Sequence, residues 1–226
     1  MVKNQREWKQ TRDACSEMAR GKGWECAEGN GEPILFSWCK TGAPWLMEYR
    51  VRDDIGKPPQ KMEAALGFSR DPYLRWSAPA GAGHGPVLVI QAAAAFRAYV
   101  RGVDNLPPLE GAGRPTWLSL WLDLCGRTDP ADLREMPPTP AALGNQWVTF
   151  AENRPDLDAT LTADLCRWFE AWPGASLGPA SLLLALLDRQ RISLVAQPHC
   201  LHRAPELALR LAAQGELLLA LKKPTS

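Results

Sequence analysis

The 226-residue sequence predicts a mixed α+β protein. An N-terminal helix and an antiparallel β-meander come first, followed by a strand, two helices, a strand and a final helix. Three observations carry this prediction. Residues 4–20 show helical spacing, residues 34–52 alternate with period two, and residues 161–172 carry an apolar stripe with helical spacing.

The N-terminal segment predicts a helix over residues 4–20. Thr11, Cys15 and Met18 recur at three- to four-residue spacing, which places them on one side of a helix. Gly21 follows directly and is expected to end the helix, because glycine is a common helix terminator.

A β-hairpin over residues 34–52 is the clearest local signal in the sequence. Its first half alternates Ile34, Phe36 and Trp38 with other residues, and the segment 40–44 contains the Gly and Pro typical of a turn. The second half has one apolar face and one largely charged face. This pattern favours an antiparallel sheet with one side open to water.

The rest of the N-terminal half predicts shorter elements. We expect strands at 24–27, 73–77 and 87–91, turns or loops at 28–33 and 53–61, and a helix at 92–101.

The C-terminal half predicts alternating strands and helices. We expect a buried strand at 117–124, irregular chain at 127–145, a strand at 147–152, a helix that starts at Asp158 or Thr162 and ends near Trp172, a short helix at 181–189, a strand at 192–196 and a helix at 205–222. Residues 102–115 are rich in Pro and Gly. They suggest either two sub-domains, residues 1–104 and 105–226, or one continuous domain.

The composition is that of a folded protein and excludes several classes. Basic and acidic residues nearly balance, 26 against 25, so the chain is not a polycation that binds nucleic acid through bulk charge. The N-terminal residues lack an apolar run, and no apolar segment is long enough to cross a bilayer. The six cysteines are scattered. We therefore expect a cytoplasmic protein of bacterial type with reduced thiols and no membrane contact.

His84 is the candidate catalytic residue. It lies in the glycine-rich segment 81–85, and an imidazole in such a loop could serve as a general base. The alternative is a solvated loop histidine. The segment precedes a strand, whereas a dinucleotide-binding loop follows one and opens a helix, so we expect no dinucleotide cofactor.

His199, Cys200 and His202 form the tightest group of candidate metal ligands. Two imidazoles with a thiol between them could hold Zn²⁺, provided that a fourth ligand or a water completed the tetrahedron. The spacing matches no known zinc module. The alternative is an ordinary turn before the final helix, and no cofactor is predicted.

Arg50, Arg52, Arg75 and Trp76 are the candidate binding residues. Arginines on one sheet face beside an aromatic ring could bind nucleic acid through phosphate contacts and base stacking. The alternative is an ordinary solvated face, because acidic residues stand nearby in the sequence.

An apolar stripe of Trp168, Phe169 and Trp172 could bind a partner or pack in the core. Its helical spacing favours the core.

The leading functional hypothesis is a non-enzymatic accessory protein, such as a subunit, adaptor or inhibitor, that acts through contacts with a protein partner. It rests on an ordered composition with ten tryptophans and on the lack of a catalytic motif. Two alternatives stay open. One is a small hydrolase or nuclease that uses His84 or the His199/His202 cluster. The other is a nucleic-acid-binding component with an Arg-rich sheet face.

Overall fold

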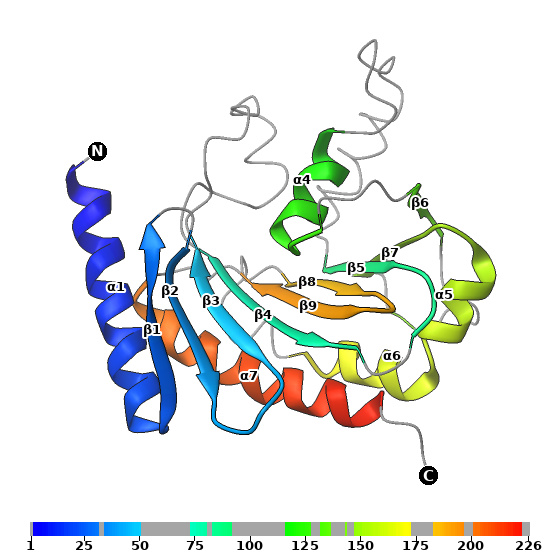
Figure 1. Ribbon diagram of the computed structural model, residues 1–226. Helices are drawn as coiled ribbons and strands as arrows, with labels where there is room; N and C mark the ends of the chain where they lie inside the picture. Colours follow the sequence, from blue (N-terminus) through cyan, green and yellow to red (C-terminus); the bar gives the residue numbers. More distant parts are fainter. Residues whose placement is uncertain are drawn as a thin grey trace.

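The computed structural model describes residues 2–31, 34–50, 73–80, 83–91, 116–127, 132–136, 143, 147–172, 183–196 and 201–222. One sheet dominates these residues (Figure 1). Its strands are β1 (Trp24–Gly31), β2 (Ile34–Lys40), β3 (Leu46–Arg50), β4 (Tyr73–Pro79), β5 (Val87–Gln91), β6 (Arg134–Glu135), β7 (Trp147–Ala151), β8 (Leu183–Leu187) and β9 (Arg191–Ala196).

The nine strands lie in the order β1-β2-β3-β4-β9-β8-β5-β7-β6, and every neighbouring pair is antiparallel. The N-terminal meander β1 to β4 forms one half of the sheet. The hairpin of β8 and β9 then inserts between β4 and β5, so strands from both sides of residue 104 share one sheet. The division into two sub-domains stays a prediction.

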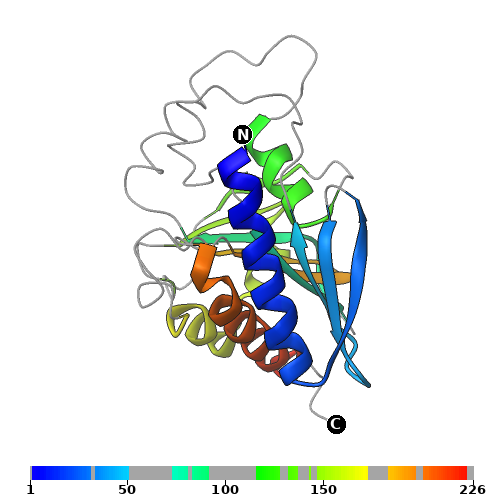
Figure 2. The ribbon, with the colours of Figure 1, turned by 90° about the vertical axis from the view of Figure 1, so that its left-hand side faces the viewer.

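Helices cover both faces of the sheet unequally (Figures 1 and 2). They are α1 (Val2–Gly21), α4 (Thr116–Leu124), α5 (Arg154–Thr160), α6 (Ala163–Glu170) and α7 (Ala204–Leu221), with a short 3₁₀ helix η2 (Leu201–Arg203) before the last. Helices α1, α6 and α7 lie on one side of the sheet, and α4 lies on the other. Two hydrophobic clusters, one on each side, fill the space between the layers.

Residue alternation along the strands assigns side chains to these two layers. On β4, Leu74 and Trp76 belong to the cluster under α7, whereas Tyr73 belongs to the cluster under α4. The α4 side is apolar over β5 and β8 but carries charged residues over β3 and β4. The site described below lies on this charged part.

Most of the predicted elements are confirmed. The N-terminal helix, the hairpin of β2 and β3, the strands at 73–77, 87–91, 147–152 and 192–196, and the final helix are all present. The predicted turn at 28–33 is wrong at residues 28–31, which belong to β1. The loop at 53–61, the helix at 92–101 and the linker at 102–115 lie outside the described residues.

Two predicted elements are wrong because both are short apolar runs, whose periodicity does not distinguish a helix from a strand. Residues 117–124 form helix α4, and the buried Leu118, Trp121 and Leu122 show the three- and four-residue spacing of a helix. Residues 183–187 form strand β8 and not a helix. This strand lies between β9 and β5 with every residue buried, which explains its continuous apolar sequence.

The stripe of Trp168, Phe169 and Trp172 is buried in the core, as its helical spacing predicts. Thr162 is the N-cap of α6, and its hydroxyl accepts from the backbone N–H of Leu165. The alternative start at Asp158 is wrong, because Asp158 lies inside the separate helix α5. Among the described helices, none combines the length and apolarity that a membrane-spanning segment needs.

Candidate functional site: an arginine cluster on the sheet

Charged side chains gather on the α4 side of β3 and β4. Cross-strand pairing places Glu48 opposite Arg75, and Arg50 opposite Tyr73. Because side chains alternate along a strand, Glu48 and Arg50 share this face, while Met47 and Tyr49 turn to the opposite cluster. The predicted charged face of the hairpin therefore exists, and the next strand adds Arg75 to it.

Glu48 is the centre of the cluster. Its side chain is buried, with 3% of the residue exposed, and Arg75 is 7% exposed. Arg75 donates from Nε (2.7 Å) and Nη2 (2.6 Å) to Glu48 Oε2, and Arg50 Nη1 donates to Oε1 at 2.9 Å. Both carboxylate oxygens thus hold a guanidinium group, which compensates for the cost of burying the charge.

Arg191 brings a third guanidinium group to the cluster from β9. Its Nη2 donates to Ser77 Oγ at 2.7 Å, and no carboxylate of the described residues forms an ion pair with it. Partial burial, and then the charge of Arg75, lower the pKa of Arg191. Three guanidinium groups and one carboxylate give this group of residues a net charge of +2.

The end of helix α4 closes over the cluster. Gly126 has a φ of 78°, and the N–H groups of Gly126 and Arg127 bond back to Asp123 and Leu122, which is a Schellman ending. A Cβ on Gly126 would lie 2.6 Å from Arg75 Nη1. Glycine at this position therefore favours the left-handed turn and leaves room for the Arg75 guanidinium. The negative end of the α4 dipole faces Arg75 as a result.

A shallow hollow of about 430 Å³ adjoins the cluster at the turn between β2 and β3. Its lining combines the charge of Arg191 and the hydroxyl of Ser77 with apolar groups. The residues around it are Pro44, Trp45, Leu46, Ser77, Ala78, Pro79, Gln190 and Arg191. Leu46 is one of the few large hydrophobic residues exposed among those described, at 37%.

The predicted catalytic residue His84 lies on the surface next to α5. It lines a smaller hollow of about 190 Å³ together with Thr160, Thr162 and Lys222. Backbone donation from Gly85 is the main cause that lowers the pKa of nearby Asp156, followed by donation from the Asn153 side chain. The catalytic role of His84 stays a prediction.

The lowered pKa of Asp156 predicts a pH effect on stability. A carboxylate with a depressed folded-state pKa contributes stability above its unfolded pKa of about 4, and the contribution is lost as the pH falls through the folded value. We expect Asp156→Asn to lower the free energy of unfolding at pH 7 and to approach the wild type in acid. Urea unfolding of both proteins from pH 7 to pH 3 measures this, and parallel curves would contradict it.

The predicted metal ligands are only partly within the described residues. His202 lies exposed in η2, while His199 and Cys200 lie outside. Within the described part of the chain, no three His, Cys, Asp or Glu side chains come close enough to hold a metal ion. Metal binding by His199, Cys200 and His202 stays a prediction.

The predicted nucleic-acid surface is corrected at two positions. Trp76 is fully buried under α7, and its ring is therefore closed to a base. Arg75 is buried and bound to Glu48, so it cannot follow a phosphate backbone as predicted. Arg50 is half-buried and bound to the same carboxylate, and Arg52 lies outside the described residues.

The sequence analysis did not predict that Glu48 binds the arginines of the cluster, or that Arg191 belongs to it. The period-two pattern places Glu48 beside Arg50, but its pairing with Arg75 needs the register of β3 and β4. Arg191 reaches the cluster only because β9 inserts next to β4. No local signal in the sequence predicts that insertion.

A second exposed surface lies on α7. Leu217 and Leu221 are 55% and 45% exposed, and the neighbouring Ala213 and Ala220 are exposed as well. These four residues fall on one side of the helix, since their spacing is four, three and one. We call them the α7 leucine surface.

Comparison with known proteins adds one distant likeness. No protein-family model and no curated protein matches the sequence. Among solved structures, the crystal structure of the mycobacterial trehalose monomycolate transport factor A, TtfA, is similar over 94% of this chain and 96% of that chain. The TM-score is 0.47 and the sequence identity is 7%. A likeness of this size establishes neither a shared fold nor a shared role.

Proposed function

We propose that this chain is a non-enzymatic accessory protein that binds a protein partner through the α7 leucine surface. The observation that supports it is the exposure of Leu217 and Leu221 on neighbouring turns of one helix. Single exposed leucines are common on protein surfaces. Several apolar residues on one helix side, next to a hollow, are more typical of an interface.

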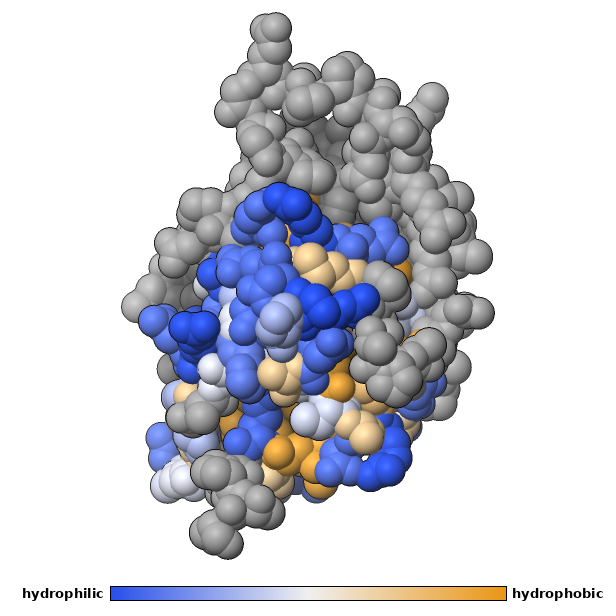
Figure 3. Space-filling model, turned by 90° about the vertical axis from the view of Figure 1, so that its right-hand side faces the viewer, coloured by the Kyte–Doolittle hydropathy of each residue, from blue (hydrophilic) through white to orange (hydrophobic). Residues whose placement is uncertain are grey.

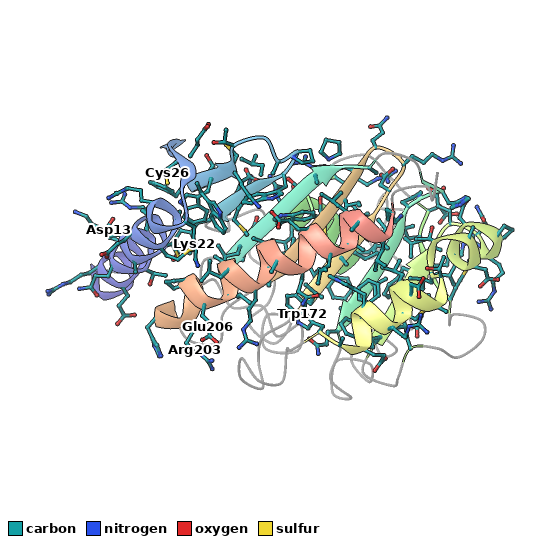
Figure 4. The ribbon with its side chains drawn as sticks, turned by 90° about the horizontal axis from the view of Figure 1, so that it is seen from below. Asp13, Lys22, Cys26, Trp172, Arg203 and Glu206 are labelled. Atoms are coloured by element: carbon teal, nitrogen blue, oxygen red, sulfur yellow. The ribbon has the colours of Figure 1, made fainter. Side chains whose placement is uncertain are left out.

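The polarity of α7 changes along its exposed side. In its first turns Glu206 receives donors from Arg203 and Arg210, so that part is solvated and charged. Figure 4 looks at α7 from below, with Arg203 and Glu206 labelled at its start. From Ala213 onward the exposed residues are mainly apolar. The solvent-exposed side of α7 is therefore polar in its first half and apolar in its second half.

The apolar half continues onto neighbouring elements. Leu221 lines the smaller hollow together with Leu165 of α6 and Ala159 of α5. Figure 3 shows hydrophobic atoms gathered at the lower end of this side of the molecule, where α6 and the last turns of α7 lie. Removing apolar surface from water contributes about 25 cal/mol per Å², so a partner that covers this region gains favourable free energy.

The helix is also held firmly, which favours binding because little order has to be gained. Trp168 Nε1 donates to the Gln214 carbonyl at 3.1 Å, and Trp45 Nε1 donates to Glu216 Oε1 at 3.0 Å. These two bonds fasten α7 to α6 and to the hairpin on both sides of Gly215. A surface fixed in this way presents its side chains with a small entropic cost on association.

A pair of charge substitutions tests the proposal. We expect Leu217→Lys/Leu221→Lys to weaken partner binding at least about tenfold, because two cationic side chains replace the apolar contact. Native mass spectrometry of the untagged protein from its own host identifies the bound protein. Titration of that purified partner against wild type and variant then measures the loss.

Ala14→Lys is the control, since Ala14 is an exposed apolar residue of helix α1 and lies on a different element from the α7 leucine surface. We expect it to retain the partner, and all variants to unfold at wild-type temperatures. Equal binding by the α7 variant and the wild type would contradict the proposal. The proposal would also be contradicted if the purified protein had no bound protein partner and hydrolysed an ester or phosphate substrate in a reaction that depends on His84.

A further inference from the structure

We propose that the hollow beside Arg191 binds a carboxylate that is attached to a small apolar group, such as the C-terminal leucine of a polypeptide or a free acylated amino acid. Leu46, Ser77 and Arg191 face the α4 side of the sheet at the turn between β2 and β3, whereas the α7 leucine surface lies on the other side. Trp45, which also borders the hollow, bonds to Glu216 of α7, but the tests of the two proposals change neither of these residues.

Arg191 supplies the charge for this site. Its Nη2 donates to Ser77, and the guanidinium has two further nitrogens in the same plane. This planar arrangement of donors matches the two oxygens of a carboxylate. Glu48 offsets only part of this charge, because its single negative charge also faces Arg50 and Arg75, which bind its two oxygens. Those two arginines add positive potential, as the lowered pKa of Arg191 indicates.

Ser77 supplies a second polar contact. Its Oγ accepts from Arg191 and can donate its own hydrogen to another oxygen. The Arg191–Ser77 bond also fixes the direction of the guanidinium plane. A carboxylate oxygen placed at the mouth of the hollow could therefore meet two donors whose positions are set before binding.

The walls of the hollow select the rest of the ligand. Pro44, Leu46 and Pro79 are all exposed, and Leu46 shares its face of the sheet with Ser77, its cross-strand partner. An apolar group the size of a leucine side chain would cover these residues and remove them from water. A phosphate fits less well, because it carries no apolar group to cover Pro44, Leu46 and Pro79, and its additional charged oxygens would lie against these apolar residues.

Three probes and the full-length protein test the site. N-acetyl-leucine carries the carboxylate and the apolar group, N-acetyl-leucinamide lacks only the charge, and inorganic phosphate lacks the apolar group. We expect N-acetyl-leucine alone to shift the NMR signals of the Arg191 side chain and the Leu46 methyls saturably, with a dissociation constant on the order of 1 mM.

Two arginine variants locate the charge. We expect Arg191→Gln to weaken N-acetyl-leucine binding at least about tenfold. Arg189→Gln removes the same charge two residues away, does not line the hollow, and should bind as the wild type does. Equal losses in both variants, saturable binding of the neutral amide, or stronger binding of phosphate than of N-acetyl-leucine would each overturn the proposal.

A peptide distinguishes the two sources of the ligand. Acetyl-Ala-Ala-Leu with a free C-terminus offers the same carboxylate and side chain as part of a chain. Binding about tenfold tighter than that of N-acetyl-leucine identifies a polypeptide C-terminus, and equal binding identifies a small free acid. Failure of every probe would overturn this inference and leave the α7 experiment unaffected, since the two tests change different residues.

Discussion

Replacing Gly215 with alanine is expected to destabilise the protein by about 1 to 2 kcal/mol, although alanine favours a helix more than glycine does. Gly215 lies on the buried side of α7, against the ring of Trp76. An added Cβ would lie 2.6 Å from Trp76 Cδ2 and closer still to Cε2 and Cζ2. Cβ atoms do not approach ring carbons so closely, so either the helix or the ring has to move.

Two opposing terms decide the sign of this change. The gain in helix propensity from glycine to alanine is about 1 kcal/mol. Forcing an extra methyl group into a packed core costs about 1 to 3 kcal/mol, and sometimes more. Here the neighbour is a fully buried tryptophan ring, which has no flexible end that could yield. The cost of overpacking is therefore expected to exceed the gain.

Urea unfolding of Gly215→Ala measures the effect. Gly21→Ala is the matched control, because Gly21 is also helical and has no atom within 4 Å of an added Cβ. We expect the control to be as stable as the wild type or slightly more stable. Gly215→Ala should cost less in a Trp76→Phe background than in the wild type, since the smaller ring leaves more room for the added Cβ. A Gly215→Ala protein as stable as the control would show that α7 can move away at no cost.

The close approach at Gly215 illustrates how far the sequence predicts this fold. The helix at 205–222 follows from its own pattern, and so does the hairpin at 34–52, because both depend on neighbours along the chain. The contact of Gly215 with Trp76 joins residues far apart in sequence. Nothing near residue 215 in the sequence predicts which ring it meets.

The candidate site shows the same division between local and long-range information. The alternation of β3 predicts a charged face with Arg50, and this face is present. Arg75 and Trp76 were expected side by side on a binding surface, but neighbours on a strand point to opposite faces. Trp76 therefore enters the core, and Arg75 reaches Glu48. The insertion of β9 next to β4, which adds Arg191, depends on the whole sheet.

Replacing Glu48 with alanine is expected to destabilise the protein by about 3 to 5 kcal/mol. Arg75 is almost fully buried, and its Nε and Nη2 both donate to the Glu48 carboxylate. Without that carboxylate the guanidinium loses the partner that compensates for the burial of its charge. The variant therefore carries a buried cation with no partner, next to Arg50 and Arg191 of the same sign.

A matched control separates this effect from the loss of any glutamate. Glu25 is exposed on β1, where it accepts from Thr41. We expect Glu25→Ala to change the free energy of unfolding by less than about 1 kcal/mol in the same urea experiment. Similar losses for Glu48→Ala and Glu25→Ala would mean that water reaches Arg75 in the folded protein.

A double variant then distinguishes a missing partner from a missing side chain. Glu48→Leu/Arg75→Leu removes both charges of the buried pair, so the remaining cost is that of altered packing. We expect it to be more stable than Glu48→Leu alone, and this difference measures how strongly the two residues depend on each other. Arg50, with 14% of its side chain exposed, bonds to the same carboxylate and loses this partner in both variants. If the double variant is no more stable than Glu48→Leu, the lower free energy of unfolding of Glu48→Leu results from altered packing on β3 and not from the unpaired charge of Arg75.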